Sequence, residues 1–261
     1  MNFDHLLVEQ PAPHITRITL FRPAVANAIN TMMAEELTFA MRKAEEDGDV
    51  RVVIITGEGP KVFCSGADLK ERKGMDKDSW EKQHDAFERM LESITECSKP
   101  VIAEVNGAAY AGGLEIALAC DFMIAASHAT FAFTEAHLGI MPGLGGTLRL
   151  PRAIGTRRAL QILLTAEPIA AKEAFFYGLV NDVAEADALL AKTLGIANQI
   201  AKNAPLAVQA IRKVVHETAH QSIEDATETE LKEYGELIET KDRIEGINAF
   251  NEKRAPPFSG E

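Results

Sequence analysis

The chain has 261 residues, enough for one large domain or for a core with a small appendage. Hydrophobic residues make up 46% and charged residues 25%, which is ordinary for a soluble globular protein. The formal net charge of −12 argues against broad binding to nucleic acids or anionic membranes, because both need a positive protein field.

Strand and helix patterns alternate from the start of the chain. Apolar and polar residues alternate over 14–22, which predicts a half-buried strand. Apolar residues at helical spacing over 31–47 predict a helix that ends at Gly48. The β-branched run at 50–59 is bounded by glycines and predicts a fully buried strand.

The same alternation continues through the middle of the chain. A helix is expected at 76–97, with Asp78 or Ser79 as its N-cap. The other expected elements are strands at 99–107, 121–127 and 129–133, a helix at 112–119, an irregular loop at 139–146 and an Arg-rich helix after it. This order predicts an α/β fold in which repeated units stack around one core.

The strand signals vanish from about Ile196 onward. Helices are expected there at 205–220, 222–240 and 241–254. We therefore predict a core at 1–195, which carries the active site, and a helical region at 196–261. Such a tail often packs on a neighbouring subunit, but the acidic residues at 224–239 equally fit a solvated face.

The cysteines and the N-terminus favour a cytoplasmic protein. The three cysteines, Cys64, Cys97 and Cys120, are odd in number and lack CxxC spacing, so we expect neither disulfides nor zinc. The first ten residues carry acids and too short an apolar run for a signal peptide. No run approaches the about 18 apolar residues that a membrane helix needs.

One charged residue, Glu115, lies within the fourteen residues from Gly107 to Cys120. Burial among apolar side chains would raise its pKa toward the range in which protons are exchanged near neutral pH. The adjacent Gly112 and Gly113 would let a backbone N–H approach a ligand closely. This pattern predicts an acid–base site at the start of a helix; the alternative is a solvated Glu on an amphipathic helix.

A glycine turn follows a buried strand in the segment FCSGADLKE, residues 63–71. One interpretation places a backbone N–H donor at Ala67 and Lys70 near ligand phosphates. The alternative is an ordinary turn into a helix, with Asp68 as the N-cap.

A second isolated carboxylate, Glu135, lies between an apolar strand and the glycine-rich loop. Together with Glu115 it could provide the paired groups that proton delivery and water activation require. A salt-bridged surface Glu is the alternative.

Other catalytic motifs do not fit the chain. It contains no GxGxxG fingerprint, no GxxxxGK[ST] loop, no GxSxG elbow and no HExxH pair. We therefore expect neither a metal site nor serine nucleophile chemistry.

In this order and spacing the segments resemble the enoyl-CoA hydratase/isomerase superfamily, also called the crotonase superfamily. The resemblance covers essentially the whole chain through FRPAVANAIN (21–30), CSGADLKE (64–71), KPVIAEVNGAAYAGGLEIALACD (99–121), FTEAHLGIMPGLGGTLRLPRAIG (133–155) and DRIEGINAFNEKRAPPF (242–258). It implies a spiral of ββα turns whose helical C-terminal region builds trimers, usually paired into hexamers.

The resemblance also implies an activity, the reversible hydration of the C2=C3 bond of a 2-enoyl-CoA. The family's catalytic glutamates fall on Glu115, which would activate the water for attack at C3, and on Glu135, which would deliver the proton to C2. The oxyanion-hole donors fall on the backbone N–H groups of Ala67 and Gly112. Coenzyme A belongs to the substrate, so no separate cofactor is expected.

CoA contacts carry over with the same resemblance. They fall on Ala24, Ala26, Ser65, Gly66, Asp68, Leu69 and Lys70 and, from a neighbouring subunit, on Phe250 and Lys253. Alternative activities are a Δ3,Δ2-enoyl-CoA isomerase, which can manage with the Glu135-type group alone, and a 3-methylglutaconyl-CoA hydratase. An RNA-binding relative is disfavoured by the net charge of −12.

The chain departs from the family pattern beside the site. Ala111 replaces the first glycine of the usual triplet and Tyr110 takes a place often held by Leu, so we expect a narrowed or tilted acyl site. Phe133 and Thr134 replace Gln-Pro and predict a more apolar environment. The far wall of the pocket is expected from 75–95.

Overall fold

The fold contains two sheets, and consecutive strands from β3 to β8 alternate between them. The computed structural model describes residues 3–261. The larger sheet has six strands in the order β1-β2-β3-β5-β7-β10, and the smaller has four in the order β4-β6-β8-β9. The strands are β1 (Leu6–Ala12), β2 (Ile15–Leu20), β3 (Val52–Gly57), β4 (Val62–Cys64), β5 (Val101–Val105), β6 (Ala108–Tyr110), β7 (Phe122–Ala126), β8 (Thr130–Ala132), β9 (Ile169–Ala170) and β10 (Asp182–Ala184).

Helices follow the strand pairs and complete the predicted spiral. The helices are α1 (Thr31–Glu46), α2 (Leu69–Arg72), α3 (Lys77–Thr95), α4 (Gly112–Ala119), α5 (Gly146–Ile154), α6 (Thr156–Thr165), α7 (Ala171–Tyr177), α8 (Leu189–Ala201), α9 (Pro205–Thr218), α10 (Ile223–Leu237) and α11 (Lys241–Glu252), with short 3-10 turns η1 (Pro23–Val25) and η2 (Glu135–Leu138). The pairs β3–β4, β5–β6 and β7–β8 each place one strand in each sheet, so the predicted α/β spiral of ββα turns is confirmed.

The centre of the larger sheet is parallel and fully buried. Strand β3 pairs in parallel with both β2 and β5, and all six of its residues are buried. Sheets covered on both faces favour continuous apolar strands over alternating ones, which explains the β-branched run. A Cβ on Gly57 would overlap the backbone of Phe63, so glycine is required where the chain turns from β3 into β4.

Several short elements differ from expectation. The seven-residue strand β1 was not predicted. Strands β4 and β6 were not predicted either, because strands of three residues carry too little pattern. The N-cap of α3 is Asp76 rather than Asp78 or Ser79, and its side chain accepts a 2.8 Å hydrogen bond from the Ser79 N–H. A carboxylate in the cap can satisfy an orphan N–H of the first turn, whereas one inside the helix cannot.

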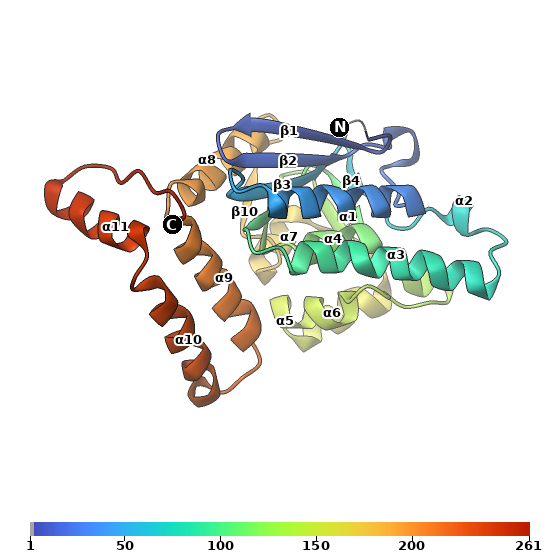
Figure 1. Ribbon diagram of the computed structural model, residues 1–261. Coiled ribbons are helices and arrows are strands. Elements are labelled where there is room, and N and C mark those ends of the chain that lie inside the picture. The colour runs from blue at the N-terminus through green and yellow to red at the C-terminus, as the bar shows by residue number, and fades with distance from the viewer. Residues whose placement is uncertain (1–2) are drawn as a thin grey trace.

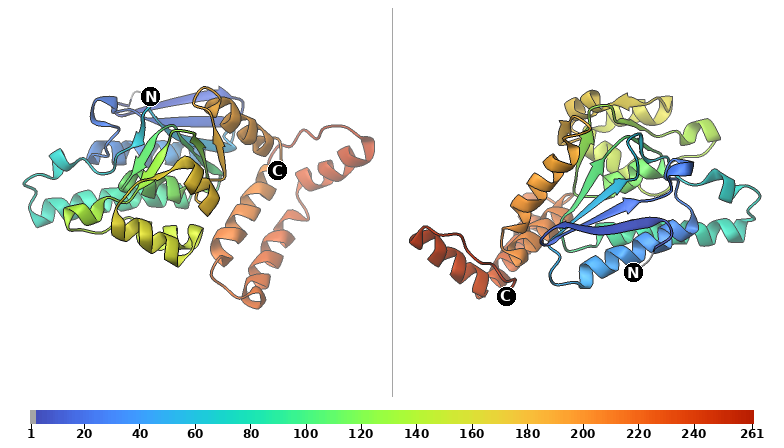
Figure 2. Two further views of the ribbon diagram at one scale, coloured as in Figure 1. Left: turned by 180° about the vertical axis from the view of Figure 1, so that it is seen from behind. Right: turned by 90° about the horizontal axis from the view of Figure 1, so that it is seen from above.

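The last three helices project away from the two sheets (Figures 1 and 2). Helix α9 has no buried residue, and Ile223, Leu231, Tyr234 and Phe250 on α10 and α11 are all more than 60% exposed. The boundary that we predict between 195 and 196 lies within α8, and the projecting helices begin at α9.

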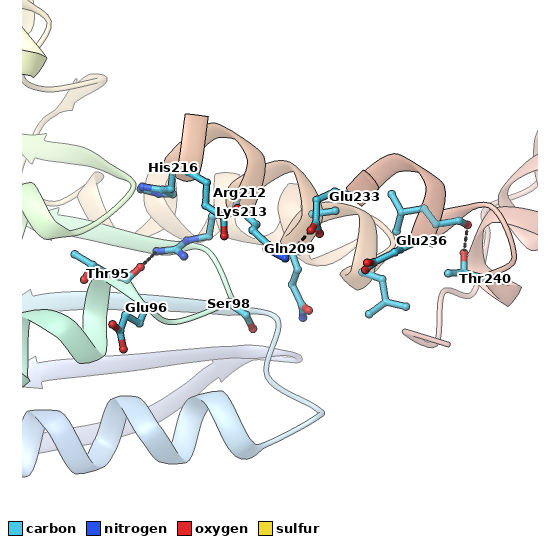
Figure 3. A pocket seen from close by; sticks show the side chains of 14 residues that line it. Thr95, Glu96, Ser98, Gln209, Arg212, Lys213, His216, Glu233, Glu236 and Thr240 are labelled. Carbon is cyan, nitrogen blue, oxygen red and sulfur yellow. Dashed lines mark hydrogen bonds and ion pairs between the residues drawn. The ribbon is translucent and has the colours of Figure 1, made fainter. Parts of the chain in front are cut away.

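A polar cavity of about 600 Å³ separates these helices from the core (Figure 3). Both of its basic side chains are paired: Arg212 contacts Asp121 at 2.9 Å and the Thr95 carbonyl at 3.1 Å, and Lys213 contacts Glu233 at 2.5 Å. The contacts of Arg212 therefore anchor α9 to the core, and the Lys213–Glu233 pair anchors it to α10. Within residues 3–261, no helix combines the length and apolarity needed to span a membrane.

Candidate active site

A second cavity, of about 500 Å³, brings together the two predicted catalytic glutamates and the two predicted oxyanion-hole residues. Glu115, Glu135, Ala67 and Gly112 all line it, although they come from three separate parts of the spiral: α4, η2 and the segment between β4 and α2. Part of the cavity wall is formed by Trp80, His84 and Phe87 of α3, so the expectation that 75–95 contributes to the pocket wall is confirmed.

Glu115 lies in the first turn of α4 and is 2% exposed. Its Oε1 accepts hydrogen bonds from the backbone N–H groups of Leu144, at 2.7 Å, and Gly146, at 2.8 Å. Burial raises the pKa of Glu115, while these two donors act in the opposite direction by stabilising the carboxylate. The predicted solvated Glu on an amphipathic helix is therefore wrong.

The glycine-rich loop has a function that sequence reasoning missed. Gly145 adopts a φ of 94°, which a residue with a side chain rarely adopts, and at this turn the N–H groups on both sides of it, those of Leu144 and Gly146, reach the same carboxylate oxygen. The loop predicted as irregular thus supplies both donors to Glu115. The glycine content indicated a turn, but no signal in the sequence indicated which side chain it would meet.

Glu135 begins the short turn η2 and is 6% exposed. Its Oε2 has no hydrogen-bond partner within residues 3–261. Burial, together with the nearby charge of Glu115, raises the pKa of Glu135 to about 7. Glu135 forms no ion pair in the described part of the chain, so the salt-bridged alternative is wrong, and the carboxyl is suited to donating a proton near neutral pH.

The raised pKa of Glu135 predicts how stability depends on pH. A carboxyl whose folded-state pKa lies near 7, above its ordinary 4.5, binds its proton more tightly in the folded protein. Its stabilising contribution is complete below about pH 4.5 and is lost as the pH rises through about 7. We therefore expect Glu135→Gln to weaken the decline in unfolding free energy between pH 5 and pH 8.

Urea denaturation of both proteins at these two pH values measures this change. Glu35→Gln is the matched control, because Glu35 is exposed and forms no ion pair among residues 3–261. An unchanged pH dependence in the Glu135 variant would contradict the expectation.

Two backbone N–H groups face the same part of the cavity. Ile29 donates to the Gly66 carbonyl and accepts from the Asp68 N–H, both at 2.8 Å. Because successive N–H groups in an extended chain point to opposite sides, the N–H of Ala67 points away from Ile29. A Cβ built on Gly112 would lie 3.8 Å from the Ala67 nitrogen, which shows how closely the two backbones approach.

Neither donor is used within the described part of the chain. Among residues 3–261, the N–H groups of Ala67 and Gly112 have no backbone or side-chain acceptor. The Gly112 N–H belongs to the first turn of α4, whose N–H groups have no partner inside the helix. Ala111, just before it, adopts a φ of 51° and a ψ of −127°, a conformation that is rare for a residue with a side chain and that turns the chain sharply from β6 into α4.

The predicted CoA-contact segments also meet. The Ser65 N–H donates to the Ala26 carbonyl at 3.1 Å, which joins the turn holding Ala24 and Ala26 to the segment from Ser65 to Lys70. Of these residues, Ser65 and Leu69 line the cavity. Asp68 caps α2, as the alternative interpretation predicted, and also pairs with Arg22 at 3.0 Å.

The two C-terminal residues lie elsewhere in the chain. Phe250 is 83% exposed on α11 and Lys253 follows that helix. Neither lines the cavity of its own chain. Their contact was expected from a neighbouring subunit, so it stays a prediction.

One departure noted in the sequence has a different consequence from that expected. The Tyr110 hydroxyl lies 3.0 Å from the Thr130 hydroxyl, and Tyr110 does not line the cavity, so the expectation that it narrows the site is wrong. Sequence reasoning also missed which individual residues of α3 line the cavity, namely Trp80, His84 and Phe87. Their spacing of four and three residues places them on one helix face, a signal that was available in the sequence.

Comparison with known proteins agrees with this arrangement. Residues 12–261 match the sequence model of the family described as Enoyl-CoA hydratase/isomerase. A crystal structure of enoyl-CoA hydratase from Bacillus anthracis superposes with a TM-score of 0.97 at 41% identity, covering 99% of this chain and 100% of that chain. The short-chain-enoyl-CoA hydratase of Clostridium acetobutylicum is 38% identical over 254 residues, covering 97% of each chain. The crotonyl-CoA hydratase of Syntrophomonas wolfei is 37% identical over 258 residues, covering 99% of each. The chain is therefore an enzyme that belongs to the enoyl-CoA hydratase/isomerase family.

Proposed function

We propose that the protein is a 2-enoyl-CoA hydratase, which adds water reversibly across the C2=C3 bond of the thioester. One observation carries this proposal: two buried carboxyl groups in unlike environments share a cavity with two unused backbone donors. Carboxyl groups whose surroundings separate their proton affinities are suited to divide the roles of base and acid.

Glu115 acts as the base in this proposal. Its Oε1 accepts two backbone N–H bonds, which favour the ionised form, and its other oxygen is left to take a proton from water. As that proton moves to Glu115, the water oxygen bonds to C3 and the π electrons shift toward the thioester oxygen.

Glu135 acts as the acid. The thioester oxygen, now negative, accepts hydrogen bonds from the N–H groups of Ala67 and Gly112, an arrangement that stabilises an enolate. The start of α4 adds a favourable dipole at the same oxygen. Collapse of the enolate takes the proton of Glu135 onto C2, and the reverse sequence dehydrates a 3-hydroxyacyl-CoA.

The rest of the substrate follows from the same placement. CoA would lie along Ala24, Ala26 and the segment from Ser65 to Lys70, with Phe250 and Lys253 supplied by a neighbouring subunit. CoA arrives with the substrate, so the scheme needs no metal and no separate cofactor. We also propose a cytoplasmic location, which is consistent with three cysteines that are free and buried.

Crotonyl-CoA tests the activity directly, because hydration removes the absorbance of the conjugated thioester. The panel should include longer 2-enoyl-CoAs, 3-methylglutaconyl-CoA and a 3-enoyl-CoA. We expect turnover of at least one 2-enoyl-CoA; turnover of the 3-enoyl-CoA alone would replace hydration by isomerisation as the function.

We also propose that the chain assembles as a trimer or a dimer of trimers. The exposed apolar side chains of α9, α10 and α11 support this, because large exposed apolar areas are typical of an interface. Light scattering on the purified protein gives the mass directly, and the mass of a 28.4 kDa monomer would contradict the proposal.

A further inference from the structure

A basic side chain that hydration does not require lines the proposed active site. Arg72 ends α2 and borders the same cavity as Glu115 and Glu135. Its guanidinium lies 5.4 Å from the centroid of the buried Phe87 ring, and its Nε donates to Gln83 Oε1 at 2.8 Å. The side chain is therefore held against α3 at the border of the cavity.

The Gln83 amide that holds Arg72 is itself fixed. Gln83 is 2% exposed, and its Nε2 donates to Glu71 Oε2 at 2.6 Å and to the Thr31 hydroxyl at 3.2 Å. Glu71 in turn accepts from the Thr31 N–H at 3.0 Å. These bonds leave the Gln83 oxygen free to accept from Arg72, so the guanidinium is oriented before any ligand arrives.

Two of the three guanidinium nitrogens have no protein acceptor. Within residues 3–261, Nη1 and Nη2 of Arg72 donate no hydrogen bond and Arg72 forms no ion pair. Burial lowers the pKa of Arg72 and the charges of Glu71 and Glu115 partly offset this, but a guanidinium stays charged at neutral pH. A partly buried cation without a direct partner is unfavourable until an anion binds it.

We propose that the site selects a 2-enoyl-CoA whose acyl chain ends in a carboxylate, and that Arg72 binds this carboxylate through Nη1 and Nη2. The inference rests on the proposed hydration, since it assigns the acyl end of that substrate. Guanidinium groups bind carboxylates through two parallel hydrogen bonds, and such bonds are shorter and stronger than those between neutral groups. The apolar residues Phe87, Leu138 and Met141 of the same cavity suit the methylene groups in between.

Matched substrates test the selection. At acyl lengths of five, six and eight carbons, each ω-carboxy-2-enoyl-CoA is compared with its methyl ester and with the unsubstituted 2-enoyl-CoA. We expect the wild-type kcat/KM to be highest for the carboxylate at one or more lengths. Arg72→Met should lower that value by about 10- to 100-fold, mainly through KM, and leave the two neutral substrates within about 3-fold.

Two further variants separate the possible roles of this charge. Arg72→Lys should retain part of the preference, because an ammonium keeps the charge but not the paired geometry. Lys73→Met is the control, since Lys73 is exposed, lies next in the chain and forms no ion pair among the described residues. Equal losses for all three substrates in Arg72→Met would overturn the proposal, because they would place Arg72 on the CoA phosphates or on Glu115.

Binding of saturated thioesters makes the test independent of hydration. Calorimetric titration with an ω-carboxyacyl-CoA and with the acyl-CoA of equal length requires no chemistry at C2=C3. Tighter binding of the carboxylate that is lost in Arg72→Met supports the inference even if no substrate is hydrated. Hydration of simple 2-enoyl-CoAs without any Arg72-dependent preference would leave the proposed function in place and reject the inference.

Discussion

Glu115→Gln should lower kcat for hydration of crotonyl-CoA by about 100-fold or more, and Glu135→Gln should do the same. The amide in the first variant cannot take a proton from water, and the amide in the second cannot give one to C2. Folding should survive the first change, because the Gln oxygen can still accept from the Leu144 and Gly146 N–H groups as Glu115 Oε1 does.

Steady-state kinetics with thermal unfolding of the same samples measures the effect of both changes. Glu35→Gln on the outer face of α1 is the control for a surface carboxylate and should match the wild type in both measurements. Nearly full hydratase turnover in either site variant, with an unchanged melting temperature, would remove that glutamate from the mechanism.

A 3-enoyl-CoA distinguishes the two glutamates further. Moving a double bond transfers one proton and adds no water, so a single carboxyl can suffice. If the protein shows any isomerase activity, Glu115→Gln should retain most of it and Glu135→Gln should lose it. Loss in both variants would indicate that Glu115 also positions the acyl chain.

The sequence predicted which residues meet at this site better than how the site is built. Glu115 could be singled out because one acid among apolar and small residues is costly to bury without a purpose. Glu135 followed from the same reasoning, and both are buried beside one cavity. Their pairing was one possibility from the residues alone, and the family resemblance strengthened it, because the nineteen residues between them say nothing about distance in space.

What could not be predicted are contacts made by backbone atoms and by distant parts of the chain. The N–H groups of Leu144 and Gly146 meet Glu115 only because Gly145 turns the loop, and no side-chain pattern records this. Gln83 of α3 accepts a hydrogen bond from Arg72 and donates one to Glu71, both on α2. The segment that connects these two helices has no clear sequence pattern from which the bonds could be predicted. Short strands such as β6 were missed for a related reason, since three residues cannot establish a period.

Gly113→Ala should lower stability and Gly112→Ala should lower turnover, although the two residues are adjacent at the start of α4. A Cβ on Gly113 would overlap the Cys64 backbone, which cannot move without shifting β4. We expect Gly113→Ala to lower the unfolding free energy by about 1–3 kcal/mol, the usual range for overpacking a close contact. Urea denaturation should show this loss whether or not a substrate is present.

Gly112→Ala should instead impair the reaction and leave stability unchanged. The new methyl group would lie 3.4 Å from Ile29 Cδ1, which is an ordinary van der Waals contact. Replacing glycine also lowers the conformational entropy of the unfolded chain, which does not destabilise the folded protein. The same methyl group would lie 3.8 Å from the Ala67 nitrogen, beside the position proposed for the thioester oxygen. Crowding that position should cost about 10- to 100-fold in kcat, somewhat less than the usual cost of removing an oxyanion donor outright. A Gly112→Ala variant with wild-type kcat would show that the oxygen does not lie between these two N–H groups, whereas a stable variant with impaired turnover would support that placement.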